Sequence, residues 1–446
     1  MDRKYWVLVA IGTGTFMAAV DGSVVNAILP VLRSTLRTDV AVIEWVITVY
    51  LLVVSGLLLG FGRLGDLRGH KDIYLAGMAA FIGSSAMCGL APSAGWLIAA
   101  RALQAVGAAM QFANSPAILT KTFPATERGR ALGLQATMTY LGLSVGPALG
   151  GLLAQYLSWR WVFFINVPVG GLALYLCTRF IARDEPDPGK PPFDLAGAAL
   201  FFSGLLSLLF ALNRGHAWGW SSPATVGLVT FAVALLMIFV RVERHRASPM
   251  LDLSLFGVRA FSSSAASAVL NYVCLYGVLF LVPFYLIQGR GLSPSRAGVL
   301  LTTQPLVMML AAPVSGAISD RRGTRVPAAL GMALLASGLL LLSRTRLDTP
   351  LYQVALALAV CGLGTGIFIA PNNSALLGAA PKNRQGIASG VLATARSAGM
   401  VLGVGLMGAI LTTVLHDGAG IDRAMAIGFT VVAALAAAGG AVVALR

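Results

Sequence analysis

The residues Ala18-Ala-Val-Asp21-Gly-Ser-Val-Val-Asn26-Ala-Ile-Leu-Pro30 close an apolar run that begins at Trp6. A helix of this length, at about 1.5 Å of rise per residue, is long enough to cross a lipid bilayer. Asp21 lies inside the run, where a carboxylate costs several kcal/mol unless it is paired, hydrated or protonated. We therefore interpret Asp21 as a functional candidate. The alternative is a carboxylate that only bonds a neighbouring helix.

The composition extends this interpretation to the whole chain. Of 446 residues, 57% are hydrophobic and 11% are charged, whereas soluble domains carry about 25% charged residues. The apolar runs are about 20 residues long and do not alternate between polar and apolar positions, which excludes a transmembrane β-barrel. The chain is predicted to be an all-α membrane protein that crosses the bilayer many times.

Basic residues outnumber acidic ones, and the formal net charge is +15. We reject nucleic acid as a partner because the lysines and arginines lie in short loops between apolar runs, a pattern that sets membrane topology. Most of these 32 residues fall on one side when the N-terminus is placed in the cytoplasm. Both termini are therefore predicted to be cytoplasmic, in a bacterial-type plasma membrane, with the lipid bilayer as the surrounding partner. We expect a monomer.

The apolar runs predict fourteen membrane spans, whose boundaries are good to a few residues. All four cysteines lie in these runs without the spacing of metal ligands, so no metal site is predicted. The predicted spans are 6–29, 43–64, 73–92, 95–118, 129–155, 161–181, 194–212, 223–243, 260–287, 296–318, 325–343, 350–378, 385–413 and 423–445.

Two segments recur along the chain. Gly62-Arg-Leu-Gly-Asp66-Leu-Arg68-Gly69-His-Lys71 matches Gly316-Ala-Ile-Ser-Asp320-Arg-Arg322-Gly323-Thr-Arg325. A second match, at nearly the same offset, aligns the span 129–155 with the span 385–413. Both matches preserve the direction of the chain through the membrane, so they predict two parallel six-helix bundles related by a pseudo-twofold axis. The predicted domains are a first bundle at 1–182, a linker and inserted two-helix hairpin at 183–247, and a second bundle at 248–446.

Arg101 is the second charge placed deep in a span. It lies about 9 Å below the outer end of its helix and Asp21 about 12 Å below the same side, so the two depths agree. Such a pair couples protonation to a substrate, or it is a static ion pair that holds two spans together. Glu44 opens the span 43–64 beside Trp45. We interpret it as a solvated end group in preference to a second cation site, and keep it as a coupling candidate.

The glycine-rich segments predict close backbone approach. Gly62, Asp66, Arg68, Gly69 and Lys71 form a short loop after the second span, and its recurrence at Asp320 and Arg322 favours a gate-like contact between the two halves. In the span 129–155, Gly142, Gly146 and Gly150 put small residues on one face, Gly151 follows, and Pro147 kinks the helix. Plain structural packing is the alternative for both segments.

Arg396 is a deep charge without an obvious local acid. It bonds backbone carbonyls, pairs with an acid of the first half, or meets an anionic group on a substrate, and we favour a structural role. Polar and aromatic side chains at membrane depth predict a pliable substrate pocket, although most such residues are packing. The pocket candidates are Asn26, Gln104, Tyr140, Asn271, Tyr272, Tyr276, Gln304, Asn372 and Arg396.

These segments together resemble the major facilitator superfamily over nearly the whole chain. Gly62 to Lys71 is similar to its loop signature, Arg101 to Gly107 to its fourth-helix signature, and Gly142 to Gly151 to its antiporter signature. Asp21 to Pro30 and Trp159 to Pro168 resemble signatures of the fourteen-helix drug:proton antiporters. His70-Lys71-Asp72 departs from the denser basic run of the family loop.

The resemblance implies a role for each matching position. Asp21 takes part in proton or cation recognition, and Arg101 couples protonation to conformation. Asp66 and Arg68 steady one access state, and Gly146 with Pro147 forms a pliable helix. No cofactor is expected, since the proton gradient supplies the energy.

We therefore expect a proton-coupled exporter of small hydrophobic or cationic compounds, such as drugs or antibiotics, that works by alternating access. Protonation of Asp21 would weaken its hold on the substrate. A transporter of a metabolite with the same fold is the alternative. A membrane enzyme is disfavoured because the four histidines are scattered among loops and no nucleophile–base pair appears. A sensor is disfavoured as well.

Overall fold

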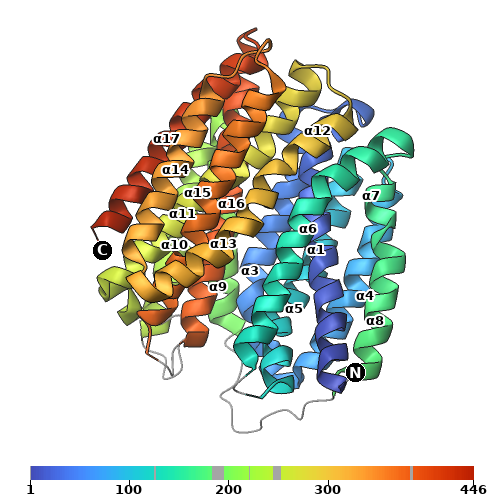
Figure 1. Ribbon diagram of the computed structural model, residues 1–446, viewed down its shortest axis with the longest axis vertical. Helices are drawn as coiled ribbons and strands as arrows, with labels where there is room; N and C mark the ends of the chain where they lie inside the picture. The colour runs from blue at the N-terminus through green and yellow to red at the C-terminus, as the bar shows by residue number, and fades with distance from the viewer. Residues whose placement is uncertain are drawn as a thin grey trace.

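In the computed structural model, residues 2–124, 127–182, 195–219, 221–244, 253–381 and 385–445 are described, and within these ranges the chain forms helices and no strand. The helices run side by side along the long axis of the molecule (Figure 1). We call the end where α1 begins the lower end and the end where α12 begins the upper end, as drawn in Figure 1.

The first half of the molecule, residues 2–182, builds one bundle. Long apolar stretches favour helices here because the backbone groups are satisfied within each helix. Ser93 caps one of them by accepting a hydrogen bond from the Trp96 amide at 3.3 Å. The helices of this half are α1 (Arg3–Thr35), α2 (Val40–Ile43), α3 (Trp45–Arg68), α4 (His70–Gly89), α5 (Ala94–Thr122), α6 (Arg128–Tyr156), α7 (Trp161–Phe164) and α8 (Asn166–Phe180).

The second half, residues 253–445, builds a second bundle. It opens with a short 3-10 helix, and one π-helical turn extends its first long helix. Its elements are η1 (Leu253–Gly257), α11 (Arg259–Phe284), η2 (Tyr285–Gly289), α12 (Pro294–Leu301), α13 (Thr303–Arg322), α14 (Arg325–Ser343), α15 (Leu351–Gly378), α16 (Gln385–His416) and α17 (Ile421–Ala444).

The repeat in the sequence is visible as repeated backbone contacts. In the first half Gly77 of α4 lies against the carbonyl of Gly107 in α5, and in the second half Gly331 of α14 lies against the carbonyl of Gly364 in α15. A Cβ atom at Gly107 would approach the Gly77 carbonyl oxygen to 2.6 Å. Only glycine allows these helix axes to come so close.

The recurring loop is a tight turn in both copies, of one residue, Gly69, in the first and of two residues, Gly323 and Thr324, in the second. Gly69 and Gly323 separate the flanking helices and have φ angles of 96° and 83°, a region that disfavours side chains. The base that follows each turn reaches the C-terminus of the last helix of its own half. Lys71 donates to the Ile181 carbonyl at 2.6 Å, and Arg325 donates to the Ala444 carbonyl.

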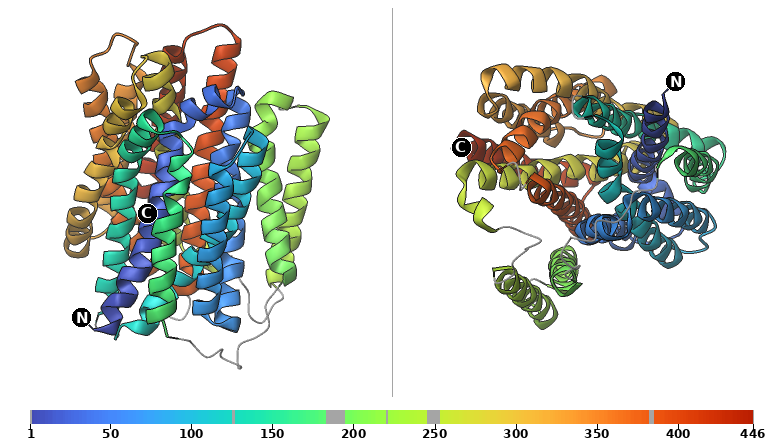
Figure 2. Two further views of the ribbon diagram at one scale, coloured as in Figure 1. Left: turned by 90° about the vertical axis from the view of Figure 1, so that its right-hand side faces the viewer. Right: turned by 90° about the horizontal axis from the view of Figure 1, so that it is seen from below.

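A helical hairpin stands beside the two bundles. It consists of α9 (Leu195–Trp218) and α10 (Pro223–Arg244), and Figure 2 shows it at the edge of the molecule. On α9, Phe202 lies against Gly56 of α3, and Phe210 packs on Trp45 with 5.1 Å between ring centroids. The hairpin also contacts α16.

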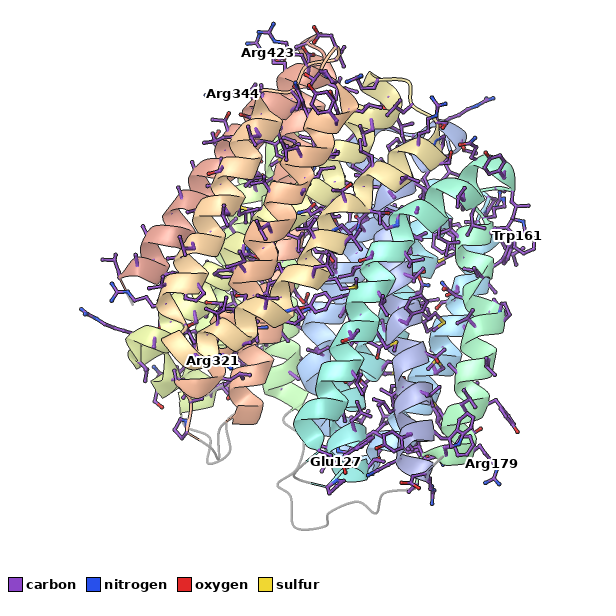
Figure 3. All side chains as sticks on the ribbon, in the orientation of Figure 1. Glu127, Trp161, Arg179, Arg321, Arg344 and Arg423 are labelled. Atoms are coloured by element: carbon purple, nitrogen blue, oxygen red, sulfur yellow. The ribbon has the colours of Figure 1, made fainter. Side chains whose placement is uncertain are left out.

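Each predicted span coincides with an observed helix or helix pair to within a few residues. Within the described residues, eleven helices are long and apolar enough to cross a membrane. In Figure 3 the charged residues Glu127, Arg179 and Arg321 lie toward the lower end, and Arg344 and Arg423 lie at the upper end. The structure is therefore that of an all-helical membrane protein, and fourteen crossings stay a prediction.

Candidate functional site

The Asp21 carboxylate is the centre of a hydrogen-bond network inside the first half. Arg101 donates to Asp21 Oδ2 at 2.5 Å. Gln104 donates to Asp21 Oδ1 at 3.0 Å, and Asn166 donates to the same oxygen at 2.8 Å. Three helices, α1, α5 and α8, thus converge on one carboxylate.

Arg101 is held on all sides by groups of the first half. Its Nε donates to the Val46 carbonyl at 3.1 Å, and its guanidinium carbon lies 4.2 Å from the ring centroid of Tyr50. Asp21 and Arg101 are each only 1% exposed. Two charges so deeply buried are tolerable because they pair and share further hydrogen bonds, whereas removal of one partner leaves an uncompensated charge.

The structure brings together Asp21 and Arg101, as their depths suggested, and adds members that the sequence did not single out. Asn166 lies in the Trp159 to Pro168 segment but was not chosen as a site residue. The sequence feature that could have pointed to Asn166 is a lone amide at the start of an apolar helix. Ser85 accepts hydrogen bonds from Gln104 at 2.7 Å and from Asn166 at 3.4 Å. No feature of the sequence pointed to Ser85. Gln104, which we named as a pocket candidate, belongs to this network, and its contact with a substrate stays a prediction.

The Glu44 side chain corrects one interpretation. We expected a solvated end group, but Glu44 is only 1% exposed and lies against Gly408 of α16. A Cβ atom at position 408 would overlap its Oε2. The second half covers Glu44, and the sequence around residue 44 gave no information about a helix so distant along the chain.

The loop segment makes its described contacts within the first half. His70 shares a hydrogen bond of 2.8 Å with Asn114 of α5, and Lys71 bonds the end of α8. Gly65 leaves room for the His70 and Asn114 side chains. Arg68 is exposed and Gly62 is half-buried. The side chains of Asp66, Asp320 and Arg322 lie outside those that the structure describes, so their gating role stays a prediction.

The glycines of α6 face two different helices. Gly142, Gly146 and Gly150 pack on α1, where a Cβ atom at Gly146 would overlap Ser23 Oγ. Gly151 packs on Pro294 at the start of α12, in the other half of the molecule. Pro147 lies inside the helix, and its carbonyl meets Gly298 of α12.

Several of the described contacts between the two halves lie at the upper end. Arg33 donates to Gln288 Oε1 at 2.7 Å, and the Ser295 amide donates to Gln155 at 3.2 Å. The Gly151–Pro294 and Glu44–Gly408 contacts lie at the same end. Among the described residues, these hydrogen bonds and glycine contacts join the halves near the ends of α1 and α6.

Arg396 lies in the second half beside tyrosines. Its guanidinium carbon is 5.2 Å from the ring centroid of Tyr272, and Tyr140 and Tyr276 are close enough to interact with it electrostatically. In the described part of the chain Arg396 forms no ion pair. The four candidates Arg396, Tyr140, Tyr272 and Tyr276 thus form one cluster.

The remaining pocket candidates make their contacts away from the cluster of Arg396 with the three tyrosines. Asn271 donates to Met332 Sδ at 3.6 Å, and Asn372 donates to the Ser264 carbonyl at 3.0 Å, both inside the second bundle. Asn26 bonds the Gly22 carbonyl of its own helix. Gln304 is buried where α13 passes Gly362 of α15.

A sequence model described as the Major Facilitator Superfamily matches residues 11–266, 194–404 and 264–446. The chain belongs to the major facilitator superfamily. A riboflavin transporter of Clostridioides difficile, RibZ, is 34% identical over 90% of this chain and 87% of its own length. Multidrug resistance protein Stp of Mycobacterium tuberculosis is 32% identical over 91% of this chain and 75% of its own.

A solved structure agrees with this family at the level of the fold. The peptide transporter POT in complex with sulfate superposes with a TM-score of 0.72 at 16% identity, covering 98% of this chain and 93% of its own. As a major facilitator superfamily member, the protein is a multi-pass membrane transporter of small molecules and not an enzyme. The drug-efflux branch of the superfamily is the one that its sequence resembles.

Proposed function

We propose that this major facilitator superfamily protein is a proton-coupled antiporter that exports small hydrophobic compounds. The observation that carries the proposal is the Asp21 carboxylate, buried in a helical bundle and bonded by Arg101, Gln104 and Asn166. An ionisable group at this depth marks a proton or ion pathway by default. The likeness to a multidrug resistance protein and the antiporter signature of α6 support export.

The membrane placement is part of the proposal. The positive-inside rule puts the lower end and both termini in the cytoplasm, and α4, α5 and α9 complete fourteen spans. The domains then run from 1 to 182, 183 to 247 and 248 to 446, and the transporter works as a monomer in the cell membrane. Residues 183–194 and 245–252, in the predicted linkers, lie outside the described residues.

The contacts between the two halves at the upper end support an inward-facing state. If the upper end is outside, then Arg33–Gln288, Gln155–Ser295 and Glu44–Gly408 close the outer side. Opening outward breaks these contacts, and protons then reach Asp21 from outside. Because all its donors come from the first half, we propose that protonation acts by releasing Arg101 and Asn166. This replaces the expectation that Asp21 holds the substrate directly.

Proton coupling is tested in everted membrane vesicles that carry the full-length protein. Riboflavin, fluorescein and ethidium serve as cargo, and respiration acidifies the interior. We expect gradient-driven uptake of at least one compound by the wild type and its loss in Asp21→Asn. Asp21→Asn/Arg101→Gln removes both charges, so its loss of transport is not a consequence of an unpaired guanidinium. Asp348→Asn, at an exposed acid, is the control.

Two outcomes would contradict the coupling role. Uptake by the wild type that persists when a protonophore collapses the gradient would show that protons are not the energy source. If Asp21→Asn/Arg101→Gln takes up the compound at the wild-type rate when a gradient is applied, Asp21 has no part in the mechanism. In both cases the abundance of each variant in the vesicle membrane must match the wild type.

A metabolite transporter is the second candidate, because one relative is a riboflavin transporter. The direction of flux separates the two functions. Accumulation of riboflavin in everted vesicles that requires an acidic interior indicates export. Accumulation in right-side-out vesicles driven by an acidic exterior indicates import.

A further inference from the structure

The cluster of Arg396 with Tyr140, Tyr272 and Tyr276 straddles the two halves. Tyr140 belongs to α6 of the first half, whereas the other three belong to α11 and α16 of the second. Gly399, one turn after Arg396, packs on the Val269 carbonyl and on Tyr272. This close approach of α16 to α11 sets Arg396 beside Tyr272. A ligand bound here would touch both halves, as expected for a transporter that works by alternating access.

The cluster is accessible where the Asp21 network is not. Arg396, Tyr140 and Tyr276 each keep part of their surface exposed, whereas Asp21 is 1% exposed. Part of the Arg396 side chain is therefore left uncovered for contact with a molecule between the halves, whereas the Asp21 carboxylate is covered.

Among the described residues, no carboxylate pairs with the charge of this cluster. Arg396 forms no ion pair among the described residues. In the second half Asp348, Asp417 and Asp422 lie at or beyond helix ends, and the first-half acid Asp21 is occupied by its three donors. The tyrosine rings offset part of the cost of covering this cation, and an anionic ligand would offset more.

The geometry points to a binding site for a planar aromatic molecule that carries an anionic oxygen, such as a carboxylate, phenolate or enolate. The rings of Tyr140, Tyr272 and Tyr276 offer stacking surface, and the Arg396 guanidinium offers a planar set of donors to the oxygen. A cationic ligand meets repulsion from Arg396, and no acid among the described residues pairs with that arginine. This narrows the expected substrates from hydrophobic or cationic compounds to aromatic compounds of neutral or negative charge.

This inference deepens the proposed function, and binding without a proton gradient tests it separately. Fluorescein and rhodamine 123 share a planar xanthene and differ in charge, so they form a matched pair of probes. Purified full-length protein in lipid nanodiscs is titrated with each dye at pH 7.5, and fluorescence anisotropy reports the dissociation constant.

We expect the wild type to bind fluorescein at least about tenfold more tightly than rhodamine 123. Arg396→Gln should remove this preference, and Arg396→Lys should retain part of it because the charge remains. Arg344→Gln, at an exposed arginine of the upper end, should bind both dyes as the wild type does.

Three results would overturn the site. They are equal or tighter binding of rhodamine 123 by the wild type, no fluorescein binding up to 1 mM (about 4 kcal/mol of binding free energy), and unchanged fluorescein affinity in Arg396→Gln. A protein that binds fluorescein through Arg396 but shows no gradient-driven uptake would leave this site standing and contradict only the proposed function.

Discussion

Arg101 and Arg396 are both arginines inside long helices, one in each half of the molecule, and their surroundings differ. Arg101 pairs with Asp21 at 2.5 Å, and both are 1% exposed. Arg396 faces tyrosines, forms no ion pair within the described residues and keeps part of its surface accessible. The two halves repeat the same helix contacts, yet one holds a sealed ion pair and the other an accessible cation.

The difference suggests that the two halves divide the work. A sealed carboxylate bonded within one bundle suits the binding of a proton, which needs no room. An accessible guanidinium among aromatic rings suits the binding of a larger molecule. On this hypothesis, proton and substrate occupy separate sites, and their competition is carried by the conformation of the protein.

The largest effect is expected from breaking the sealed pair. Asp21→Asn leaves the Arg101 guanidinium buried without its anion, so the free energy of unfolding should fall by about 3–5 kcal/mol. Asp21→Asn/Arg101→Gln should recover most of this loss because no charge remains. Unfolding by sodium dodecyl sulfate in mixed micelles, followed by circular dichroism, measures both.

The matched variant in the other half is Arg396→Gln. It leaves no carboxylate behind, so its stability should stay within about 1 kcal/mol of the wild type. A large loss of stability in Arg396→Gln would mean that Arg396 is a structural residue. A small loss in Asp21→Asn would mean that water reaches Arg101.

The sequence predicted the parts of this picture that depend on local pattern. The apolar runs follow from the spacing of residues within each helix, and the Gly69 and Gly323 turns follow from the match between two short segments. The similar depths of Asp21 and Arg101 follow from their distances to the ends of their own spans. Glu44 was misjudged because its burial depends on Gly408 of α16, more than 350 residues away.

The sequence also could not predict the direction in which a side chain points from its helix. Asn271 and Arg396 looked alike as polar groups at membrane depth, yet Asn271 turns into its own bundle toward Met332. Apolar helices bury residues on several faces, so the sequence pattern does not show which face looks toward the other half. The role of Asn166 was missed for the same reason.

An intermediate effect is expected at the repeated glycines. Gly146 packs on Ser23 of α1, and Gly403 packs on the Val273 carbonyl of α11. Gly146→Ala and Gly403→Ala should each cost about 1–3 kcal/mol because the helix pair must separate. The same micelle unfolding assay measures both variants.

Gly83 provides the control, since nothing lies within 4 Å of a Cβ atom built there, and Gly83→Ala should cost nothing. If the losses of unfolding free energy in Gly146→Ala and Gly403→Ala differ by more than about 2 kcal/mol, the width of the predicted range, the two halves are not packed alike. Equal and negligible costs would show that the α1–α6 and α11–α16 contacts yield easily.

The smallest effect on stability is expected at Tyr50, which lies between the two sites. The guanidinium carbon of Arg101 lies 4.2 Å from the centroid of the Tyr50 ring. The Tyr50 hydroxyl is buried without a hydrogen-bond partner in the described part of the chain. Tyr276 of the second half is close enough to interact with Tyr50. Tyr50→Phe keeps the ring and removes an unsatisfied group, so stability should change by less than about 1 kcal/mol. Fluorescein affinity should also persist, because Tyr50 is outside the cluster.

Transport should respond differently if this hydroxyl links the two sites. Tyr50 stacks on Arg101 and lies near Tyr276 of the cluster, so we expect its hydroxyl to respond when protonation of Asp21 releases Arg101. We expect the initial rate of gradient-driven uptake in Tyr50→Phe vesicles to fall about tenfold, equivalent to about 1.4 kcal/mol in the barrier. A wild-type rate would mean that the halves communicate through the packing of α1 on α11, with no contribution from this side chain. A loss of fluorescein affinity would instead place Tyr50 in the binding site itself.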